Sequence, residues 1–353
     1  MIRTLFFLLL PVISFGQLCD GVLTPPITEQ ARYNQLQAPT TDTSTVSIYF
    51  ETDYNLYNHF GSKAAVKTFV EGVFAEVQKI YLADGVKLRI DSIGYNTTPD
   101  NFNTNSSAIN LTNFAAKMDS VHPTADCYMI LSKATYNLGG IAYVDILQSV
   151  NDYYRVGYCN VYTSYYAYPS YSWSVYVVAH ELGHMIKSQH TQWCGWLLPN
   201  GTNGAIDSCY TSEGGCNTTT ASNSNGTIMS YCHINGAVNF NKGFGALPKA
   251  AINDGVFNAK INGFLKAHSC DVFDLTATST ANSINITWNG YADKYKVAYR
   301  QKGTTTWLVA PAQLFPPKTI YNLLPNTIYQ VKVKPYCNSL WGTFSKIINI
   351  KTL

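Results

Sequence analysis

Three histidines and one glutamate lie close together in the chain, between His180 and His190. On a helix, His180 and His184 sit one turn apart on the same face, so their imidazoles can converge on one ion. Glu181 lies beside them, within reach of a water molecule on that ion. Two histidines and a glutamate at this spacing form the HExxH pattern, which supplies two zinc ligands and a general base. The residue types therefore predict a hydrolytic zinc site.

His190 is the candidate for a third protein ligand, which a catalytic zinc ion needs while it keeps a fourth position for water. A continuing helix would turn His190 to roughly the opposite face, at about 100° per residue. We therefore expect the helix to end after Ile186. Cys232 and His233 are competing ligand candidates, but three histidines already complete the protein's share. The alternative is a chance HExxH on a buried helix whose histidines only pack, and His190 weakens it.

The stretch from His180 to His190 resembles the signature of the metzincin zinc endopeptidases, HExxHxxGxxH. In this chain Lys187 stands where the family has Gly. A glycine turns out of a helix with positive φ at no steric cost, whereas a lysine there would lose on the order of 1 kcal/mol. Because three metal bonds outweigh that cost, we expect the turn to survive, either strained or slightly reshaped.

Met-Ser-Tyr at 229–231 is similar to the Met-turn that metzincins place beneath the zinc ion. The resemblance implies that Met229 forms an apolar floor under the three histidines and is not a ligand. In the astacin and serralysin branches, a tyrosine two residues after the Met reaches the zinc ion or the developing oxyanion. The same role for Tyr231 is therefore implied, with simple packing as the alternative.

Small residues precede a β-branched and aromatic run at 138–144, which suits an exposed edge strand. This run resembles the strand that borders the cleft in the reprolysin or adamalysin branch of the metzincins. The resemblance implies that substrate pairs with it as an extra antiparallel strand. The pairing residues are then Gly140, Ile141, Ala142 and Tyr143. An ordinary edge strand is the alternative.

The first residues of the chain predict export. A basic start is followed by a short apolar run from Leu5 to Phe15, which is typical of a signal peptide over 1–16. A lipid anchor at Cys19 is a less favoured alternative. Removing residues 1–16 lowers the formal net charge from +3 to +2, and no basic stripe for nucleic acid follows. We expect a secreted protein without a membrane span.

Nine cysteines in an exported chain predict disulfides, and the odd number leaves one unpaired or shared. A bridge from Cys194 to Cys232 would fasten the loops that flank the zinc site, and Cys127 with Cys159 is a guess from their positions near strands. The expected bridges are Cys194–Cys232, Cys209–Cys216 and Cys270–Cys337. Connectivity cannot be deduced from sequence alone. Cys19 begins a Cys-Asp-Gly-Val stretch that faintly resembles latency segments whose thiolate occupies the zinc, although a disulfide is favoured.

The pattern of apolar residues predicts an α+β (α/β) catalytic domain over 45–268, with a mixed twisted sheet and an active-site helix, after a leader or short pro-segment over 17–44. Alternating or continuous apolar runs predict its strands, and three- and four-residue spacing predicts its helices. We expect strands at 46–53, 86–91, 127–131 and 155–161. We expect helices from Lys63, over 110–120, from Ser172 and over 251–267.

The composition changes near Cys270, and short alternating strands follow. Leu323 to Tyr329 resembles the Leu-x-Pro-x-Thr-x-Tyr corner of fibronectin type III domains, and Trp288 lies on an early strand. The resemblance implies an all-β sandwich over 271–353. Such domains often space or bind, and the sequence marks no particular ligand for this one.

Together these features predict a secreted zinc endopeptidase that acts as a monomer on protein or peptide substrates. Glu181 would accept the proton of the attacking water and pass one to the departing amine. One zinc ion is expected, structural calcium is left open, and no nucleic acid partner is expected. The alternatives are an inactive protein of the same fold that binds or adheres outside the cell, and zinc hydrolysis of a substrate other than peptides.

Overall fold

The computed structural model describes residues 22–23, 45–216, 225–234, 236–265, 272–290, 292, 294–313, 316–337 and 340–353. The predicted signal peptide lies outside these residues, and so does Cys270 with its expected bridge to Cys337. The chain divides between Lys266 and Ala267 into two compact units, each with its own hydrophobic core. No helix among the described residues combines the length and apolar character that a membrane span requires.

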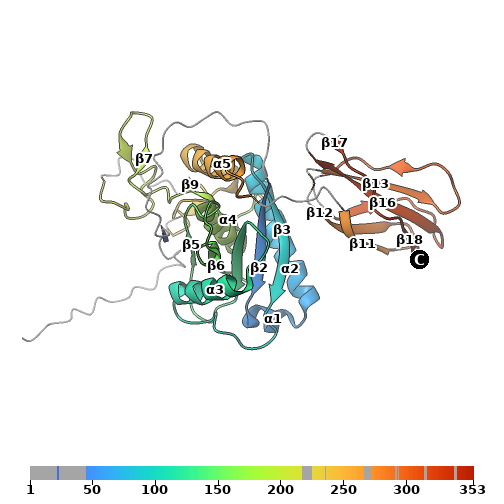
Figure 1. Ribbon diagram of the computed structural model, residues 1–353, viewed down its shortest axis with the longest axis horizontal. Helices are drawn as coiled ribbons and strands as arrows, with labels where there is room; N and C mark the ends of the chain where they lie inside the picture. Colours follow the sequence, from blue (N-terminus) through green and yellow to red (C-terminus); the bar gives the residue numbers. More distant parts are fainter. Residues whose placement is uncertain are drawn as a thin grey trace, which may run out of the picture. The chain divides into compact units, whose positions relative to one another are not determined.

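A six-stranded sheet forms the centre of the first unit, in the order β1-β5-β6-β4-β2-β3 (Figure 1). Its strands are β1 (Val22–Leu23), β2 (Thr45–Thr52), β3 (Lys87–Tyr95), β4 (Cys127–Ser132), β5 (Gly140–Tyr143) and β6 (Val156–Asn160). Strands β2, β3, β4 and β6 are parallel, whereas β5 runs antiparallel to β6. The sheet is therefore mixed, as predicted, and β5 pairs with β6 although 12 residues separate them in the chain.

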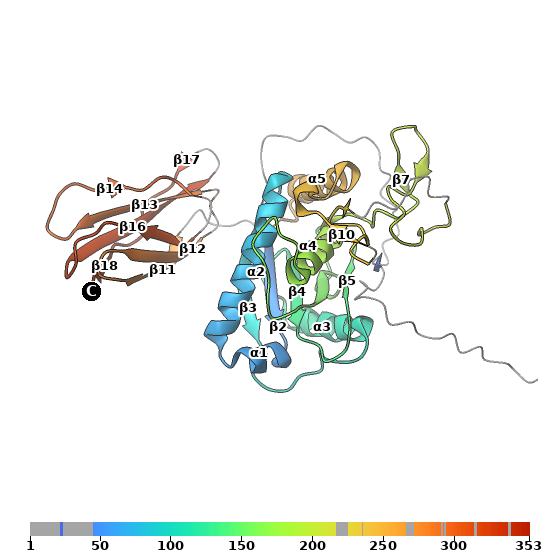
Figure 2. The same ribbon diagram turned by 180° about the vertical axis from the view of Figure 1, so that it is seen from behind.

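Five helices are described, α1 (Tyr54–Phe60), α2 (Lys63–Ala83), α3 (Ser107–Val121), α4 (Trp173–Ile186) and α5 (Ala246–Ile261). Figure 2 shows α2 and α4 on one side of the sheet and α3 on the other. The alternating side chains of β4 agree: Met129 packs in the core with α2 and α4, and Ile130 packs with α3. All six residues of β4 are buried, as its continuously apolar sequence suits a strand covered on both faces.

Local sequence signals set several of these boundaries. The Ser62 hydroxyl accepts a hydrogen bond from the Ala65 amide at 3.2 Å and caps α2, because the first amides of a helix lack partners within it. Helix α5 begins at Ala246, five residues before the expected start. The short elements of this unit are η1 (Asp152–Tyr154), η2 (Phe240–Lys242), β7 (Trp196–Leu197), β8 (Asn203–Gly204), β9 (Asn225–Gly226) and β10 (Ala237–Val238).

The second unit consists of two antiparallel sheets over a core that includes Trp288. One sheet contains β11 (Val272–Ser279), β12 (Ile284–Gly290) and β15 (Lys318–Ile320). The other contains β13 (Lys294–Gln301), β14 (Leu308–Val309), β16 (Ile328–Cys337), β17 (Leu340–Trp341) and β18 (Ile348–Lys351). At the expected corner, the Leu324 amide donates a hydrogen bond to the Tyr329 hydroxyl at 3.0 Å. The all-β sandwich predicted for this region is confirmed.

Candidate metal and catalytic site

Helix α4 brings the first two histidines onto one buried face. It packs against α2, where the Tyr81 hydroxyl donates a hydrogen bond to the Ala179 carbonyl at 2.9 Å. His184 Nε2 lies 3.1 Å from His180 Nε2 and 2.9 Å from His190 Nε2. All three rings are at most 1% exposed. The side chains that the sequence proposed as ligands therefore converge on one point.

The outer nitrogen of each ring is held by a protein oxygen. Nδ1 of His180 lies 2.7 Å from the Ile228 carbonyl, and Nδ1 of His184 lies 2.8 Å from the Ser188 carbonyl. A carbonyl only accepts, so these Nδ1 atoms carry the protons and the Nε2 lone pairs face inward. Burial, followed by the neighbouring histidines, holds the pKa of His180 and of His184 well below its usual range.

This arrangement fits a metal ion. Nε2 of His184 faces Nε2 of His180 and of His190 across about 3 Å, a geometry that a bound cation stabilises and that three bare nitrogens alone do not favour. The triad offers one ligand atom from each residue within a common small volume. A second such group, Asp207 with Cys209 and Cys232, is excluded because both sulfurs are in a disulfide.

Glu181 lies between the active helix and strand β5. It is 1% exposed, and a Cβ built at Gly140 would come within 2.6 Å of Glu181 Cγ and still closer to Oε1. Real Cβ atoms essentially never approach that closely, so only glycine fits at this position. Gly140, the first residue of the strand expected to pair with substrate, thus packs directly against Glu181, the expected general base.

Met229 and Tyr231 both lie beside the triad. Met229 is fully buried, and its Sδ would come within 2.6 Å of a Cβ at Gly183, inside the HExxH stretch. The Tyr231 ring lies 4.6 Å from the His190 ring, centroid to centroid. These contacts agree with a floor under the histidines and a tyrosine next to them. The competing ligand His233 instead packs against Tyr176, with ring centroids 4.8 Å apart.

The turn after α4 is reshaped, and the predicted backbone cost does not arise. Helix α4 ends at Ile186 as expected, and Lys187 has φ 170°, which is extended backbone that any residue adopts. The Lys187 ammonium is buried and donates to Asp254 Oδ2 of α5 at 2.8 Å. It also lies 3.8 Å from Asp145 Oδ2, in the loop after β5. The residue that departs from the family pattern therefore ties three segments together.

The expected disulfide pairing around the site is wrong, although the four cysteines are correct. The bridges are Cys194–Cys216 and Cys209–Cys232. Backbone hydrogen bonds explain why the cysteine partners differ from those expected. The Cys194 amide donates to the Glu213 carbonyl at 2.8 Å, which brings the 213–216 segment alongside Cys194. The Ile206 amide donates to the Thr191 carbonyl, and the Thr191 amide donates to the Met229 carbonyl, which places Cys209 near Cys232.

The Cys127–Cys159 guess is also wrong, because both are buried free thiols. In the register of β4 with β6, Cys159 lies opposite Leu131, four residues along the strand from Cys127. Four residues of strand span about 13 Å, far beyond the reach of a disulfide.

The outer edge of β5 is partly covered by the chain itself. Val22 pairs with Ala142 and Leu23 with Tyr143, in the parallel direction. The sequence predicted an exposed edge over Gly140 to Tyr143. With the leader attached, the pairing positions of Ala142 and Tyr143 are occupied, while no such partner is described for Gly140 and Ile141.

A family model described as "Metallo-peptidase family M12" matches residues 42–241. The chain belongs to this family. A fibronectin type III model matches residues 271–351, so the M12 peptidase unit is followed by a fibronectin type III domain. No curated protein matches the chain. These matches agree with the metzincin resemblance and with both predicted fold classes.

Three of the solved structures that are similar to the chain each cover about a quarter of it. One titled "Myokine structure" is 17% identical and covers 24% of this chain and 98% of its own, with a TM-score of 0.22. A human fibronectin type III domain is 19% identical, covering 24% of this chain and 74% of its own, also with a TM-score of 0.22. Three titin domains, A168–A170, are 18% identical and cover 23% and 32%, with the same TM-score.

Glu213 of the M12 unit was missed by the sequence analysis. Its Oε1 lies 2.7 Å from His190 Nδ1 and accepts a hydrogen bond from Gln192 Nε2 at 3.1 Å. A carboxylate behind a ligating histidine fixes the ring and raises its basicity. The signal was weak but present, because Glu213 and Asp207 are the carboxylates of the loop between His190 and Asn225.

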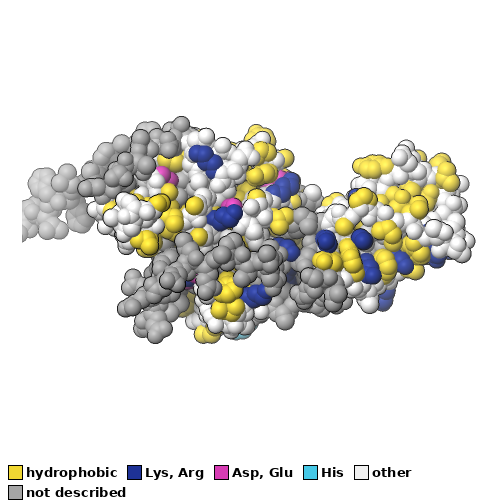
Figure 3. Space-filling view, turned by 90° about the horizontal axis from the view of Figure 1, so that it is seen from above, with side chains coloured by type: hydrophobic (Ala, Val, Ile, Leu, Met, Phe, Trp, Pro, Cys, Tyr) yellow, Lys and Arg dark blue, Asp and Glu magenta, His cyan; other side chains and the backbone are white. Residues whose placement is uncertain are grey.

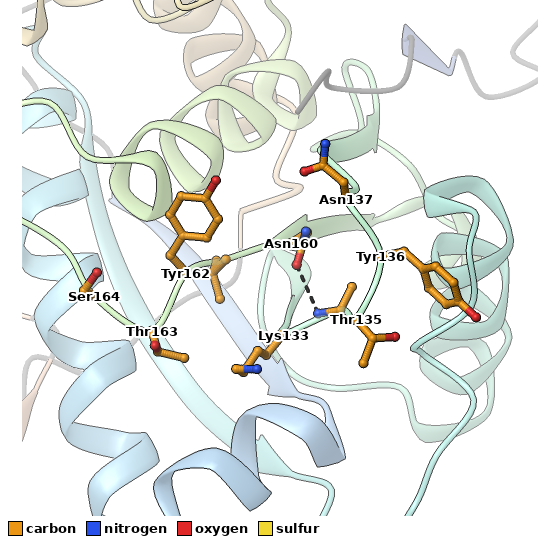
Figure 4. Close-up of a pocket in the computed structure, with 10 residues that line it drawn as sticks. Lys133, Thr135, Tyr136, Asn137, Asn160, Tyr162, Thr163 and Ser164 are labelled. Atoms are coloured by element: carbon orange, nitrogen blue, oxygen red, sulfur yellow. Dashed lines mark hydrogen bonds between the residues drawn. The ribbon is translucent and has the colours of Figure 1, made fainter. Parts of the chain in front are cut away.

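A separate polar hollow of about 430 Å³ lies at the carboxyl ends of β4 and β6 (Figure 4). It is lined by 133–137 and 160–164, and none of the three histidines is among them. Asn160 Oδ1 accepts a hydrogen bond from the Ala134 amide at 3.0 Å in its wall. One of its lining segments, 133–137, lies just before β5 in the chain, since Asn137 is three residues before Gly140.

Proposed function

We propose that this protein is a secreted zinc endopeptidase that hydrolyses peptide bonds. The observation that carries the proposal is the convergence of three Nε2 atoms, with that of His184 about 3 Å from those of His180 and His190, next to a buried Glu181 packed on β5. Membership of family M12 supports a metallopeptidase. The two disulfides support an oxidising compartment outside the cytosol.

The three histidines would hold one zinc ion through Nε2, with Ile228, Ser188 and Glu213 fixing the rings. A bound zinc ion supplies a Lewis acid and lowers the pKa of water to roughly 7. Glu181 is the general base, because it follows His180 directly on the helix and is buried, whereas Glu213 is held behind His190 by its hydrogen bond with Nδ1. It accepts a proton from the attacking water and returns one to the leaving amine.

Tyr231 is the proposed stabiliser of the oxyanion. Its ring packs against His190 and is 3% exposed, so the side chain is held beside the reacting centre. A phenol hydroxyl aimed at a developing negative charge lowers the barrier without forming a covalent intermediate. Met229 supports the histidines from below through its contact with Gly183.

Strand β5 is the proposed docking edge for the peptide. Gly140 lies against Glu181, so a peptide paired with β5 passes next to the general base. Because β1 pairs with Ala142 and Tyr143, a long substrate must displace it. We therefore expect the protein to cleave faster after proteolytic removal of the leader up to residue 44.

The test is incubation of the protein without residues 1–16 with an unfolded protein substrate, with and without a metal chelator, beside Glu181→Ala. We expect cleavage that the chelator stops and zinc restores, and about 10²- to 10⁴-fold slower cleavage by the variant. Cleavage that persists in chelator, or equal cleavage by the variant, contradicts the proposal. Glu71→Ala, an exposed acidic residue of α2, is the matched control and should cleave normally.

A further inference from the structure

Charge is divided unevenly between the two units. Residues 271–353 hold nine of the 24 Lys and Arg residues but three of the 21 Asp and Glu residues. The formal net charge of this stretch is therefore +6, whereas that of the remaining chain is −3. Figure 3 shows basic side chains interspersed with hydrophobic ones across the second unit. The whole chain has a formal net charge of only +3, but its fibronectin type III domain is strongly basic.

Five of these cations lie together on one sheet face, and we call them the basic face. They are Lys294, Lys296 and Arg300 of β13 with Lys332 and Lys334 of β16. Because side chains alternate along a strand, positions 294, 296 and 300 point to the same side. The cross-strand register places Lys296 directly opposite Lys334, and Ala298 opposite Lys332. The cations thus form two adjacent rows.

Like charges placed directly opposite each other destabilise a sheet. Among the described residues, no carboxylate forms an ion pair with any of the five. The backbone pairing does not require these charges, because an uncharged residue at Lys296 or Lys334 would keep the same register. A row of uncompensated cations therefore indicates an external anion.

Aromatic rings hold these cations in place. The Lys296 ammonium lies 4.4 Å from the Trp341 ring centroid, and Lys332 lies 4.1 Å from both Trp307 and Phe344. The Arg300 guanidinium lies 4.5 Å from Trp307. Such contacts restrict the long side chains before any ligand arrives, which lowers the ordering cost of binding.

We propose that the basic face binds an acidic polysaccharide. Cations along each strand repeat about every 6.8 Å where they occupy alternate positions, and the two rows suit a linear polymer with a carboxylate or sulfate on its repeating units. Single-stranded nucleic acid is less suited, since its bases need uncovered rings for stacking and these rings are covered by cations. Membrane docking needs a broad apolar surface, whereas Lys296 and Lys334 occupy the centre of this face.

The experiment measures binding of the protein without residues 1–16 to polygalacturonate and to dextran sulfate at physiological ionic strength, with uncharged dextran as the blank. We expect binding to at least one acidic polymer, weakening as salt is added, and none to dextran. The variant Lys296→Gln/Lys334→Gln should lose roughly tenfold or more in affinity, because each lysine near an anionic surface contributes substantially.

The control is Thr276→Glu/Thr278→Glu, which changes the net charge by the same two units on exposed positions of β11, in the other sheet. It should bind nearly as well as the unmodified protein, and unfolding temperatures of all three proteins should agree. Absence of binding to both acidic polymers, or an equal loss in the control, overturns the proposal. So does tighter binding to anionic phospholipid vesicles or to single-stranded oligothymidylate than to either polysaccharide.

Discussion

The two units of this protein use charged side chains in opposite ways. In the M12 unit, the ionisable groups of the site are buried, and protein oxygens hold them: His190 by Glu213, and His180 and His184 by carbonyls. In the fibronectin type III domain, five cations lie on one face without a carboxylate partner among the described residues. Buried and satisfied groups indicate a built site, while uncompensated surface groups indicate a partner. Substitutions in the first set should therefore have much larger effects on hydrolysis.

Apart from the loss of Glu181 itself, the largest effect is expected from Gly140→Ala. The added methyl group has no room beside Glu181, so the carboxylate must move. A displacement of about 1 Å at a catalytic group can cost 10²-fold in rate, and we expect a loss of that order in kcat for peptide cleavage. Zinc content should remain unchanged. Ile141→Val is the matched control on the same strand, and similar losses in both variants would refute the specific role of the glycine.

Glu213→Gln tests the partner of the third histidine. Loss of the carboxylate should weaken zinc binding about 10- to 100-fold, because the His190 ring is less firmly oriented and less basic. Competition with a chelator of known affinity measures this change. Asp207→Asn, in the same loop, serves as the comparison. Equal zinc affinity in the unmodified protein and Glu213→Gln would show that this carboxylate does not support the ligand.

Lys187→Met should destabilise the M12 unit by about 1–3 kcal/mol, because it leaves Asp254 and the partly buried Asp145 without their cation. Lys249 is an exposed residue of α5 that pairs with Asp84, and Lys249→Met should lower the free energy of unfolding by less than about 1 kcal/mol. Chemical denaturation of the metal-loaded protein measures both.

Lys187→Gly should be no more stable than Lys187→Met, since the backbone at this residue is extended. A stabilising glycine would contradict the described turn.

The smallest effect on hydrolysis is expected from Lys296→Gln/Lys334→Gln. These residues lie on the basic face, outside the peptidase unit, so kcat and KM for a short peptide should stay within error. The free energy of unfolding should change by less than about 0.5 kcal/mol, or rise slightly as the like-charge pair is removed. A loss of peptide cleavage comparable to that of Gly140→Ala would end the contrast between the two units.

The sequence predicted what depends on short spacing. The placement of His180 and His184 one turn apart follows from helical periodicity, and the end of the helix at Ile186 follows from the need to bring His190 back. The expected helix start at Lys63 is confirmed for the same local reason, since Ser62 caps it. The sandwich corner at Tyr329 was recognisable because its residues are close together in the chain.

Long-range partners could not be predicted. Lys187 bonds to Asp254, 67 residues away, and no local pattern predicts that contact. The free-energy cost expected for a lysine with positive φ at position 187 was wrong, because the backbone there is extended. The disulfide pairing was predicted wrongly because backbone pairing within the loop after His190 decides which cysteines meet. Glu213 was missed for the same reason. Pairing of β1 with β5 joins residues about 120 positions apart, beyond any periodicity argument.

The most direct test of the central claim measures zinc content and cleavage together in the unmodified protein and in Glu181→Gln. The account predicts one zinc ion per chain in both proteins, since Glu181 is not a ligand, with cleavage of an unfolded substrate at least about 10²-fold slower in the variant. Zinc loss in Glu181→Gln, or cleavage at the unmodified rate, would contradict the assignment of three histidines as ligands and Glu181 as the base.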